Sequence, residues 1–178
     1  MFRSNEVTFH VVPILCGQLR STIICLSTPI SNHRLIKKHV EQGYRPIIVC
    51  SAMGKTTNTL LSAGDFALKG QVIVESLRTM HVGTARTLGL PDSTIDSLNA
   101  LLDSLERLLE GVSYIGELTP RTSDALVSFG ERLSIRIVSS QLNKMGIPAQ
   151  PFDAWTIGMQ TTSEFGNAEV RAVLSEAL

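Results

Sequence analysis

Apolar positions between residues 126 and 145 predict a helix around which the rest of the chain is organised. One apolar face repeats at spacings of three and four, as expected for a helix. It consists of Leu126, Phe129, Leu133 and Ile137. A second face consists of Val127, Ser134, Val138, Leu142 and Met145. The narrow polar strip that remains is Ser128, Arg132, Ser139 and Asn143. A helix that is apolar on nearly all sides is buried, so this segment is expected to lie inside the fold.

Two residues of this helix are costly where they stand. Glu131 falls on the second apolar face, four residues after Val127 and four before Ile135. A carboxylate in a buried helix needs a partner or it neutralises. Gly130 costs a helix about 1 kcal/mol relative to alanine. We therefore expect another part of the chain to approach the backbone at Gly130. On geometry alone, however, a Glu131 satisfied by an arginine elsewhere in the chain is the favoured interpretation of the carboxylate.

A second informative stretch is a strand, a tight turn and a helix in succession. The apolar run 46–51 predicts a buried parallel strand, and residues 51–57 form a turn before a helix from about 57 to 69. Such a unit points the free N–H groups of a helix start at an anion. The end of the turn imitates a phosphate-binding P-loop, but Val49 occupies the position of the required first glycine, which excludes that motif.

The remaining periodic segments predict further helices and one strand. Residues 71–89 read as a helix, followed by a leucine-striped helix that starts at an N-cap of Asp92 or Ser93 and ends at Gly111. These two are expected to form a hairpin packed on the sheet. Thr119 and Pro120 suit the start of the central helix. The alternation of the predicted helices with predicted strands indicates an α/β layered domain.

The end of the chain predicts a strand, a loop and a helix, in that order. Residues 147–153 alternate and include two prolines, which favours an edge strand. Residues 153–167 are rich in threonine and glycine and predict a loop. Asn167 is then expected to cap a final helix.

Residues 1–43 are basic and rich in serine and threonine, and three interpretations of them stay open. The composition is compatible with an organelle transit peptide. The apolar runs 9–16 and 22–26 could equally be strands. An incorrectly joined exon is the third interpretation. Residues 35–43 predict the end of a helix that stops at Gly43.

Composition excludes several classes of function. The chain of 178 residues has 16 basic and 16 acidic residues, so its charge favours neither nucleic acid nor an anionic membrane surface as a partner. No apolar run approaches the roughly 20 residues that span a bilayer. Three cysteines and four scattered histidines show no metal-ligand spacing, and we expect a reducing compartment.

Two blocks of sequence carry a resemblance to a known family. The stretch ELTPRTSDALVSFGERLS, followed by LNKMGIPAQPFDAWTIGMQTTSEFGNAEV, and the earlier VCSAMGKTTN at 49–58 resemble the aspartate kinases of the amino-acid kinase family. The resemblance runs from about Arg45 to Val170 and is closest to the plant and algal monofunctional type. It implies a layered α/β/α sandwich of the amino-acid (carbamate) kinase type, with only the N-terminal, substrate-binding half present. Residues 44–178 would be this partial catalytic domain, after a divergent segment 1–43.

The resemblance also implies an activity and roles for particular residues. Aspartate kinases use ATP, with Mg²⁺, to phosphorylate the β-carboxylate of L-aspartate, the first step toward lysine, threonine, methionine and isoleucine. Glu131 would bind the α-amino group of aspartate, and Ser51 and Thr57 would contact the substrate from the facing turn. A supporting set would be Lys55, Phe129, Gly130 and Arg132. The loop containing Asp153 and Thr161–Thr162 would form the pocket wall.

Departures from the family limit what this chain is expected to do. The family's Lys-Phe-Gly-Gly-Thr-Ser strand, whose lysine stabilises the transferring phosphoryl group, has no counterpart in residues 1–43. The nucleotide-binding half, with Gly-Arg-Gly-Gly-Ser-Asp, and the regulatory ACT domains would lie beyond Leu178. We therefore expect a truncated chain that is weakly active or inactive alone, with no catalytic residue assigned.

The alternative is a non-catalytic module that binds aspartate. It could also pair with a full-length kinase through a sheet edge and the leucine-rich hairpin, or form a homo-oligomer. The plant-like resemblance and the basic start suggest a plastid location, and otherwise the cytoplasm.

Overall fold

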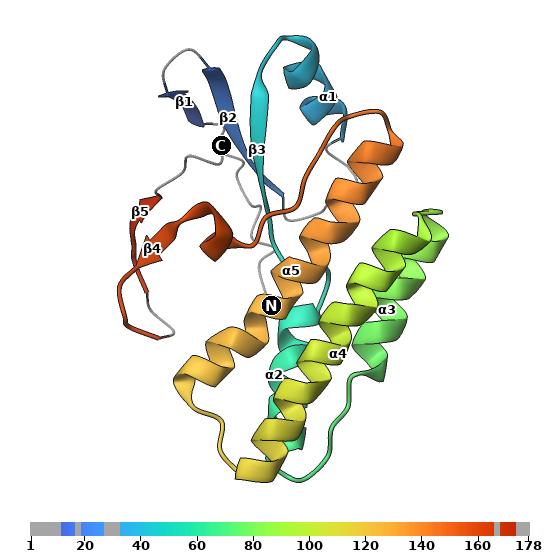
Figure 1. Ribbon diagram of the computed structural model, residues 1–178, viewed down its shortest axis with the longest axis vertical. Coiled ribbons are helices and arrows are strands. Elements are labelled where there is room, and N and C mark those ends of the chain that lie inside the picture. Colours follow the sequence, from blue (N-terminus) through green and yellow to red (C-terminus); the bar gives the residue numbers. More distant parts are fainter. Residues whose placement is uncertain (1–11, 17–18, 27–32, 166–167, 174–178) are drawn as a thin grey trace, which may run out of the picture.

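The computed structural model describes residues 12–16, 19–26, 33–165 and 168–173. A sheet with one covering helix lies at one end of the molecule, and a group of helices lies at the other (Figure 1). The long helix α5 (Pro120–Lys144) runs from the helical group to the sheet and contacts both. It is therefore the element that joins the two parts, as its two apolar faces predict.

Over the residues that the structure describes, the main sheet has three strands in the order β1-β2-β3. Strand β1 (Val12–Cys16) pairs antiparallel with β2 (Leu19–Leu26), and β2 pairs parallel with β3 (Arg45–Cys50), with Ile23 opposite Ile47. The predicted strand at 46–51 is thus confirmed as the parallel strand β3. The expectation that it is buried is wrong: only Cys50 is buried and Val49 is 49% exposed, because β3 lies at the edge of the described sheet. Of the interpretations of the N-terminal segment, the strand interpretation holds for the part that the structure describes, since residues 12–16 and 19–26 are strands.

Helix α1 (His33–Glu41) packs on β3 and leads to Gly43, which has the positive φ of +81° that a turn glycine adopts. The predicted stop at Gly43 is confirmed.

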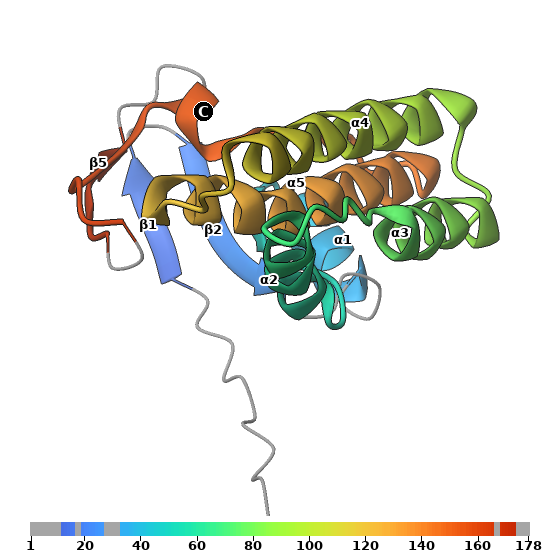
Figure 2. The same ribbon diagram turned by 90° about the horizontal axis from the view of Figure 1, so that it is seen from below.

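Three further helices complete the helical group with α5. They are α2 (Thr56–Ala67), α3 (Glu75–Thr87) and α4 (Asp92–Ile115). Seen from below, α4 and α5 lie side by side, and α2 and α3 lie beneath them in the view (Figure 2). The predicted hairpin of α3 and α4 therefore exists, but it packs on α2 and α5 rather than on the sheet.

Among the described residues the core divides into two clusters, and α5 contributes one face to each. The larger cluster buries Leu126, Phe129, Leu133 and Ile137 among the leucines of α4. The smaller places Val138 and Leu142 against Ile36, Cys50 and Ile147. Both predicted apolar faces are therefore real. Met145 is an exception, because it follows the helix and is exposed. Ser139 is a second exception, since this member of the predicted polar strip is buried.

The start and end of α5 confirm the sequence prediction. The Oγ1 of Thr119 accepts a hydrogen bond from the backbone N–H of Thr122 at 3.1 Å, with Pro120 in the first turn. At the other end, Gly146 has a φ of +77°. The ends of α4 differ from the prediction. Its N-cap is Pro91, and it continues past Gly111 to Ile115, because Gly116 takes the left-handed conformation instead.

The last third of the chain contains two errors of prediction. Residues 147–153 form no strand, because the side chain of Asn143 both donates to the carbonyl of Ala149 and accepts from its N–H. The predicted loop and final helix instead contain a short 3-10 helix, η1 (Ala154–Ile157), and an antiparallel pair of strands. These are β4 (Met159–Thr161) and β5 (Val170–Val173). The expected cap Asn167 lies outside the described residues.

A lysine joins the far ends of two helices. The Nζ of Lys144, the last residue of α5, donates to the carbonyl oxygens of Leu88 at 2.6 Å and Gly89 at 3.0 Å. These carbonyls follow the end of α3, where a positive charge also complements the helix dipole. The contact therefore fixes the C-terminal end of α3 against the C-terminal end of α5.

Candidate functional site

The candidate site is built around a close approach between α5 and the turn that follows β3. A Cβ placed on Gly130 would lie 2.7 Å from the Cβ of Ala52, 3.4 Å from Thr56 Cγ2 and 3.5 Å from Leu60 Cδ1. Real Cβ atoms essentially never lie as close as the first of these distances. The predicted approach to the backbone at Gly130 is thus confirmed, and the partner is the turn 51–55.

This approach brings together the two blocks that sequence analysis singled out. Ala52 is the neighbour of Ser51, and Gly130 is the neighbour of Glu131, so the turn lies against the stretch of helix that carries the acidic residue. Ser51, Lys55 and Thr57 are all exposed, which leaves their polar groups accessible to a ligand.

The threonine next to Thr57 has a structural role instead. Thr56 is fully buried, and its Oγ1 donates to the carbonyl of Met53 at 2.6 Å. Since Thr56 also begins α2, this bond closes the turn onto the helix.

Glu131 is half-buried rather than fully buried. Within the described part of the chain, no hydrogen bond or ion pair engages its carboxylate. The interpretation in which an arginine satisfies Glu131 is therefore wrong for the arginines in the described part of the chain. Partial exposure explains how the carboxylate stands on an otherwise apolar face, because water still reaches it.

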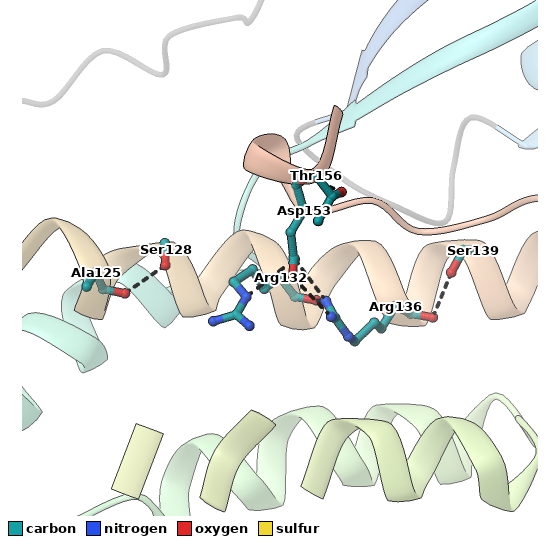
Figure 3. Close-up of polar contacts among 7 residues, drawn as sticks. All are labelled: Ala125, Ser128, Arg132, Arg136, Ser139, Asp153 and Thr156. Carbon is teal, nitrogen blue, oxygen red and sulfur yellow. Dashed lines mark hydrogen bonds and ion pairs between the residues drawn. The ribbon is translucent and has the colours of Figure 1, made fainter. Parts of the chain in front are cut away.

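The adjacent Arg132 belongs to an ionic cluster with the loop after α5. Asp153 lies between two arginines of the helix: Arg132 Nε is 3.3 Å from its Oδ1, and Arg136 Nη1 is 3.4 Å from the same oxygen (Figure 3). Arg136 also donates to the carbonyl of Arg132 at 2.8 Å. The cluster holds η1 against α5. One of its members, Arg132, directly follows Glu131 in sequence.

Two aromatic rings complete the cluster. The guanidinium carbon of Arg132 lies 4.8 Å from the ring centre of Phe129 and 5.0 Å from that of Trp155. Such distances are within the range of cation–π attraction. Phe129 is buried, whereas Trp155 is 59% exposed. The ring of Phe129 therefore lies against Arg132, so two members of the expected supporting set contact each other.

Sequence reasoning missed Arg136 and Trp155. The available signal was the spacing of Arg132 and Arg136, four residues apart on a mostly apolar helix. Two cations on one helix face predict an acidic partner, and Asp153 had already been placed near the site.

A buried histidine supports the turn from behind. His81 of α3 is fully buried, with Nδ1 2.8 Å from the carbonyl of Leu77 and Nε2 3.4 Å from Thr56 Oγ1. Burial lowers the pKa of His81 below its ordinary value of 6.5, and the hydrogen bond to Leu77 opposes this shift. The neutral imidazole is therefore favoured in the folded protein.

The described residues form neither a group of metal ligands nor a membrane-spanning helix. Among the described residues, no three histidine, cysteine or acidic side chains come close enough to hold a metal ion. Over the same residues, no helix has both the length and the apolar character needed to cross a bilayer.

Comparison with known proteins defines the class to which this arrangement belongs. Residues 32–178 match the model of the amino acid kinase family, so the match includes α1 and begins before the expected boundary at 44. The fold is that of solved aspartokinase domains. It superimposes with a TM-score of 0.67 on Escherichia coli aspartokinase III in complex with lysine and aspartate, at 22% identity. That alignment covers 85% of this chain and 34% of the solved one. The same enzyme with aspartate and ADP gives a TM-score of 0.64.

The chain belongs to the amino acid kinase family, and its curated relatives are aspartokinases. It is 47% identical over 133 residues to the chloroplastic aspartokinase 2 of Arabidopsis thaliana, which is 71% of this chain and 24% of the relative. The aspartokinase of Schizosaccharomyces pombe is 33% identical over 124 residues, covering 61% of this chain and 24% of the relative. The chain thus spans about a quarter of the length of these relatives.

Proposed function

We propose that this chain carries the aspartate-binding part of an aspartate kinase, which phosphorylates the β-carboxylate of L-aspartate with ATP. The observation that supports the proposal is the close approach of Gly130 to Ala52, because it brings the turn 51–57 against the part of α5 that carries Glu131. The similarity to aspartokinases solved with bound aspartate and ADP supports the same substrates.

Glu131 would recognise the α-ammonium of aspartate. Its carboxylate is half-buried and has no partner within the described part of the chain, so its charge is available to a cation. A partly desolvated carboxylate attracts an ammonium more strongly than one in bulk water. Recognition of this group would select a free amino acid over other dicarboxylates.

The turn would meet the rest of the substrate. Exposed hydroxyls of Ser51 and Thr57 can donate hydrogen bonds to a carboxylate, and Lys55 adds positive charge beside them. Phosphoryl transfer depends mostly on alignment and charge stabilisation, so donors fixed by a rigid turn suit this reaction. The buried Thr56 and the contact at Gly130 provide that rigidity.

ATP and Mg²⁺ belong to the proposal through the family alone. The described residues contain no group of three metal ligands, so no residue here is assigned to the metal. The sequence motifs for the phosphoryl-stabilising lysine and for the nucleotide are also not found in this chain. A plastid location is proposed from the chloroplastic relatives.

The proposal is tested by calorimetric titration of the chain with L-aspartate. Glu131→Gln keeps the shape of the side chain and removes its charge. We expect a loss of affinity of roughly ten- to a hundredfold, since hydrogen bonds to charged groups contribute about 1.5–3 kcal/mol. Glu110→Gln, on the exposed side of α4, is the matched control and should bind as the wild type does. Equal affinities of all three proteins would refute the role of Glu131.

A second assay separates the kinase from an aspartate-binding module. ATP-dependent formation of aspartyl phosphate can be trapped with hydroxylamine as the hydroxamate. Hydroxamate that depends on Glu131 would support a complete kinase reaction by this chain. Aspartate binding without hydroxamate would favour the non-catalytic module.

A further inference from the structure

Arg132 is held in one orientation by contacts that leave part of its guanidinium unused. Its Nε donates to Asp153 at 3.3 Å, and its guanidinium carbon lies about equally far from two ring centres, at 4.8 Å for Phe129 and 5.0 Å for Trp155. One ring belongs to the same helix and the other to η1. The side chain is therefore fixed between the helix and the loop.

The terminal nitrogens of Arg132 are the unused part. Across the described residues, neither of them has a hydrogen-bond partner. Figure 3 shows them pointing away from Asp153, beyond the dashed contact made by Nε. The side chain is 21% exposed, so solvent and small solutes reach it. Two parallel N–H groups of this kind match the two oxygens of a carboxylate or phosphate.

The charge of the cluster points in the same direction. Asp153 is the carboxylate that both arginines contact, so two positive charges face one negative charge. Arg136 uses its terminal nitrogens on Asp153 and on the carbonyl of Arg132. The side chains of the three residues are between 12% and 21% exposed, which weakens screening of the excess positive charge. The cluster consequently favours an additional anion at Arg132.

We propose that Arg132 is an oxyanion-binding residue, whose free guanidinium edge takes the carboxylate or phosphoryl group of a small ligand beside Trp155. This goes beyond the proposed function, where Arg132 only supports Glu131, and it needs no kinase activity. Pre-ordering by Asp153 and the two rings means that little side-chain entropy is lost on binding.

The position of Trp155 makes the proposal directly measurable. It is the only tryptophan of the sequence, and its ring contacts the proposed ligand-binding group. Tryptophan fluorescence can be followed while inorganic phosphate or succinate is added at constant ionic strength, with chloride as the reference salt. We expect a saturable change with at least one of the two anions. The anion that acts identifies the ligand class as phosphoryl or carboxylate.

Arg132→Lys is the decisive variant. It keeps the positive charge and removes the pair of parallel N–H donors of the guanidinium, so the affinity for the active anion should fall at least tenfold. Arg121→Gln changes an exposed arginine in the first turn of the same helix and should leave the affinity unchanged. An unaltered affinity in Arg132→Lys, or a wild-type response that does not saturate, would overturn the proposal.

A second measurement covers the case in which Arg132→Lys fails to fold. In wild-type protein, the guanidinium ¹⁵N signals of Arg132 should shift with the anion, while those of Arg136 move less. Shifts confined to other arginines would contradict the assignment. Because succinate and phosphate lack an ammonium, the result also stands apart from the test of Glu131 with L-aspartate.

Discussion

At the scale of single residues, the absence of one side chain decides how the candidate site is assembled. Gly130 allows α5 to lie against the turn after β3, where any Cβ would meet Ala52 at 2.7 Å. The obstacle is the methyl group of a short, rigid residue beside the backbone, so it cannot rotate away. The site therefore depends on a glycine that weakens the helix.

Gly130→Ala should lower both stability and L-aspartate affinity. Overpacking typically costs about 1–3 kcal/mol of stability. Replacing glycine by alanine in a helix gains about 1 kcal/mol, so the upper part of the overpacking range outweighs this gain. Urea unfolding and aspartate titration measure the two effects. Gly111→Ala, in α4 with nothing within 4 Å, should instead stabilise the protein.

A compensating substitution sharpens this prediction. Ala52→Gly removes the opposing methyl group, so the double variant with Gly130→Ala should recover most of the loss. If the two substitutions were simply additive, the contact would not be the cause.

His81 is the residue through which pH should act on stability. Neutral His81 fits the buried site, and its pKa is lowered by burial. Below pH 6.5 the unfolded chain takes up the proton first, so this contribution to stability falls from there down to the lowered pKa and then levels off.

His81→Gln should therefore reduce the loss of stability on acidification. The expected difference from wild type is up to about 1.4 kcal/mol for each pH unit between the two pKa values. Urea midpoints at pH 8.0 and about pH 5.5 measure it. An equal loss in both proteins would place the acid sensitivity in other groups.

Single residues also show where sequence reasoning ended. The pairing of Gly130 with a nearby backbone was predictable, because a glycine in a buried helix needs a reason. That its partner is Ala52 was not, since the contact joins segments about eighty residues apart in sequence. The roles of Thr56 and Thr57 were equally hidden, because only the phase of α2 decides which of two adjacent threonines is buried.

At the scale of elements, predictions succeeded where local chemistry decides and failed where distant contacts do. The start of α5 follows from Thr119 and Pro120 alone, since a cap acts within one turn. Residues 147–153 alternate like a strand, yet Asn143 from the preceding helix takes up the backbone groups of Ala149. Similarly, Val170–Val173 pairs with β4 instead of forming the expected helix.

Thr119→Ala should cost about 1 kcal/mol of stability, because the N–H of Thr122 loses its side-chain acceptor. The shift of the thermal midpoint measures the effect. Thr87→Ala is the matched control at the exposed end of α3, where the threonine hydroxyl donates to the carbonyl of Gly83 within the same helix. A control that loses as much as Thr119→Ala would argue against a capping effect.

At the scale of the whole molecule, α5 makes one cooperative unit from two core clusters. Its first face belongs to the cluster of α2, α3 and α4, and its second to the cluster of α1 and β3. The family match from residue 32 onward includes both clusters. Loss of packing in either cluster should therefore be felt in the other.

Leu133→Ala should increase amide hydrogen exchange in α1 as well as in α4. Removing this fully buried side chain costs about 2–5 kcal/mol, and the loss is transmitted because α5 is shared. Tyr114→Ala, at a position that is 94% exposed, provides the reference. Unchanged exchange in α1 would mean that the clusters open independently.

The lysine at the end of α5 has a further chemical consequence. Lys144 directs its ammonium at the carbonyls of Leu88 and Gly89, so its nitrogen must leave both before it can act as a nucleophile. Amine-acylating reagents should accordingly label Lys69 or Lys55 sooner than Lys144. The rate at which Lys144 is labelled therefore reports how often α3 separates from α5. Mass spectrometry measures this rate without any ligand.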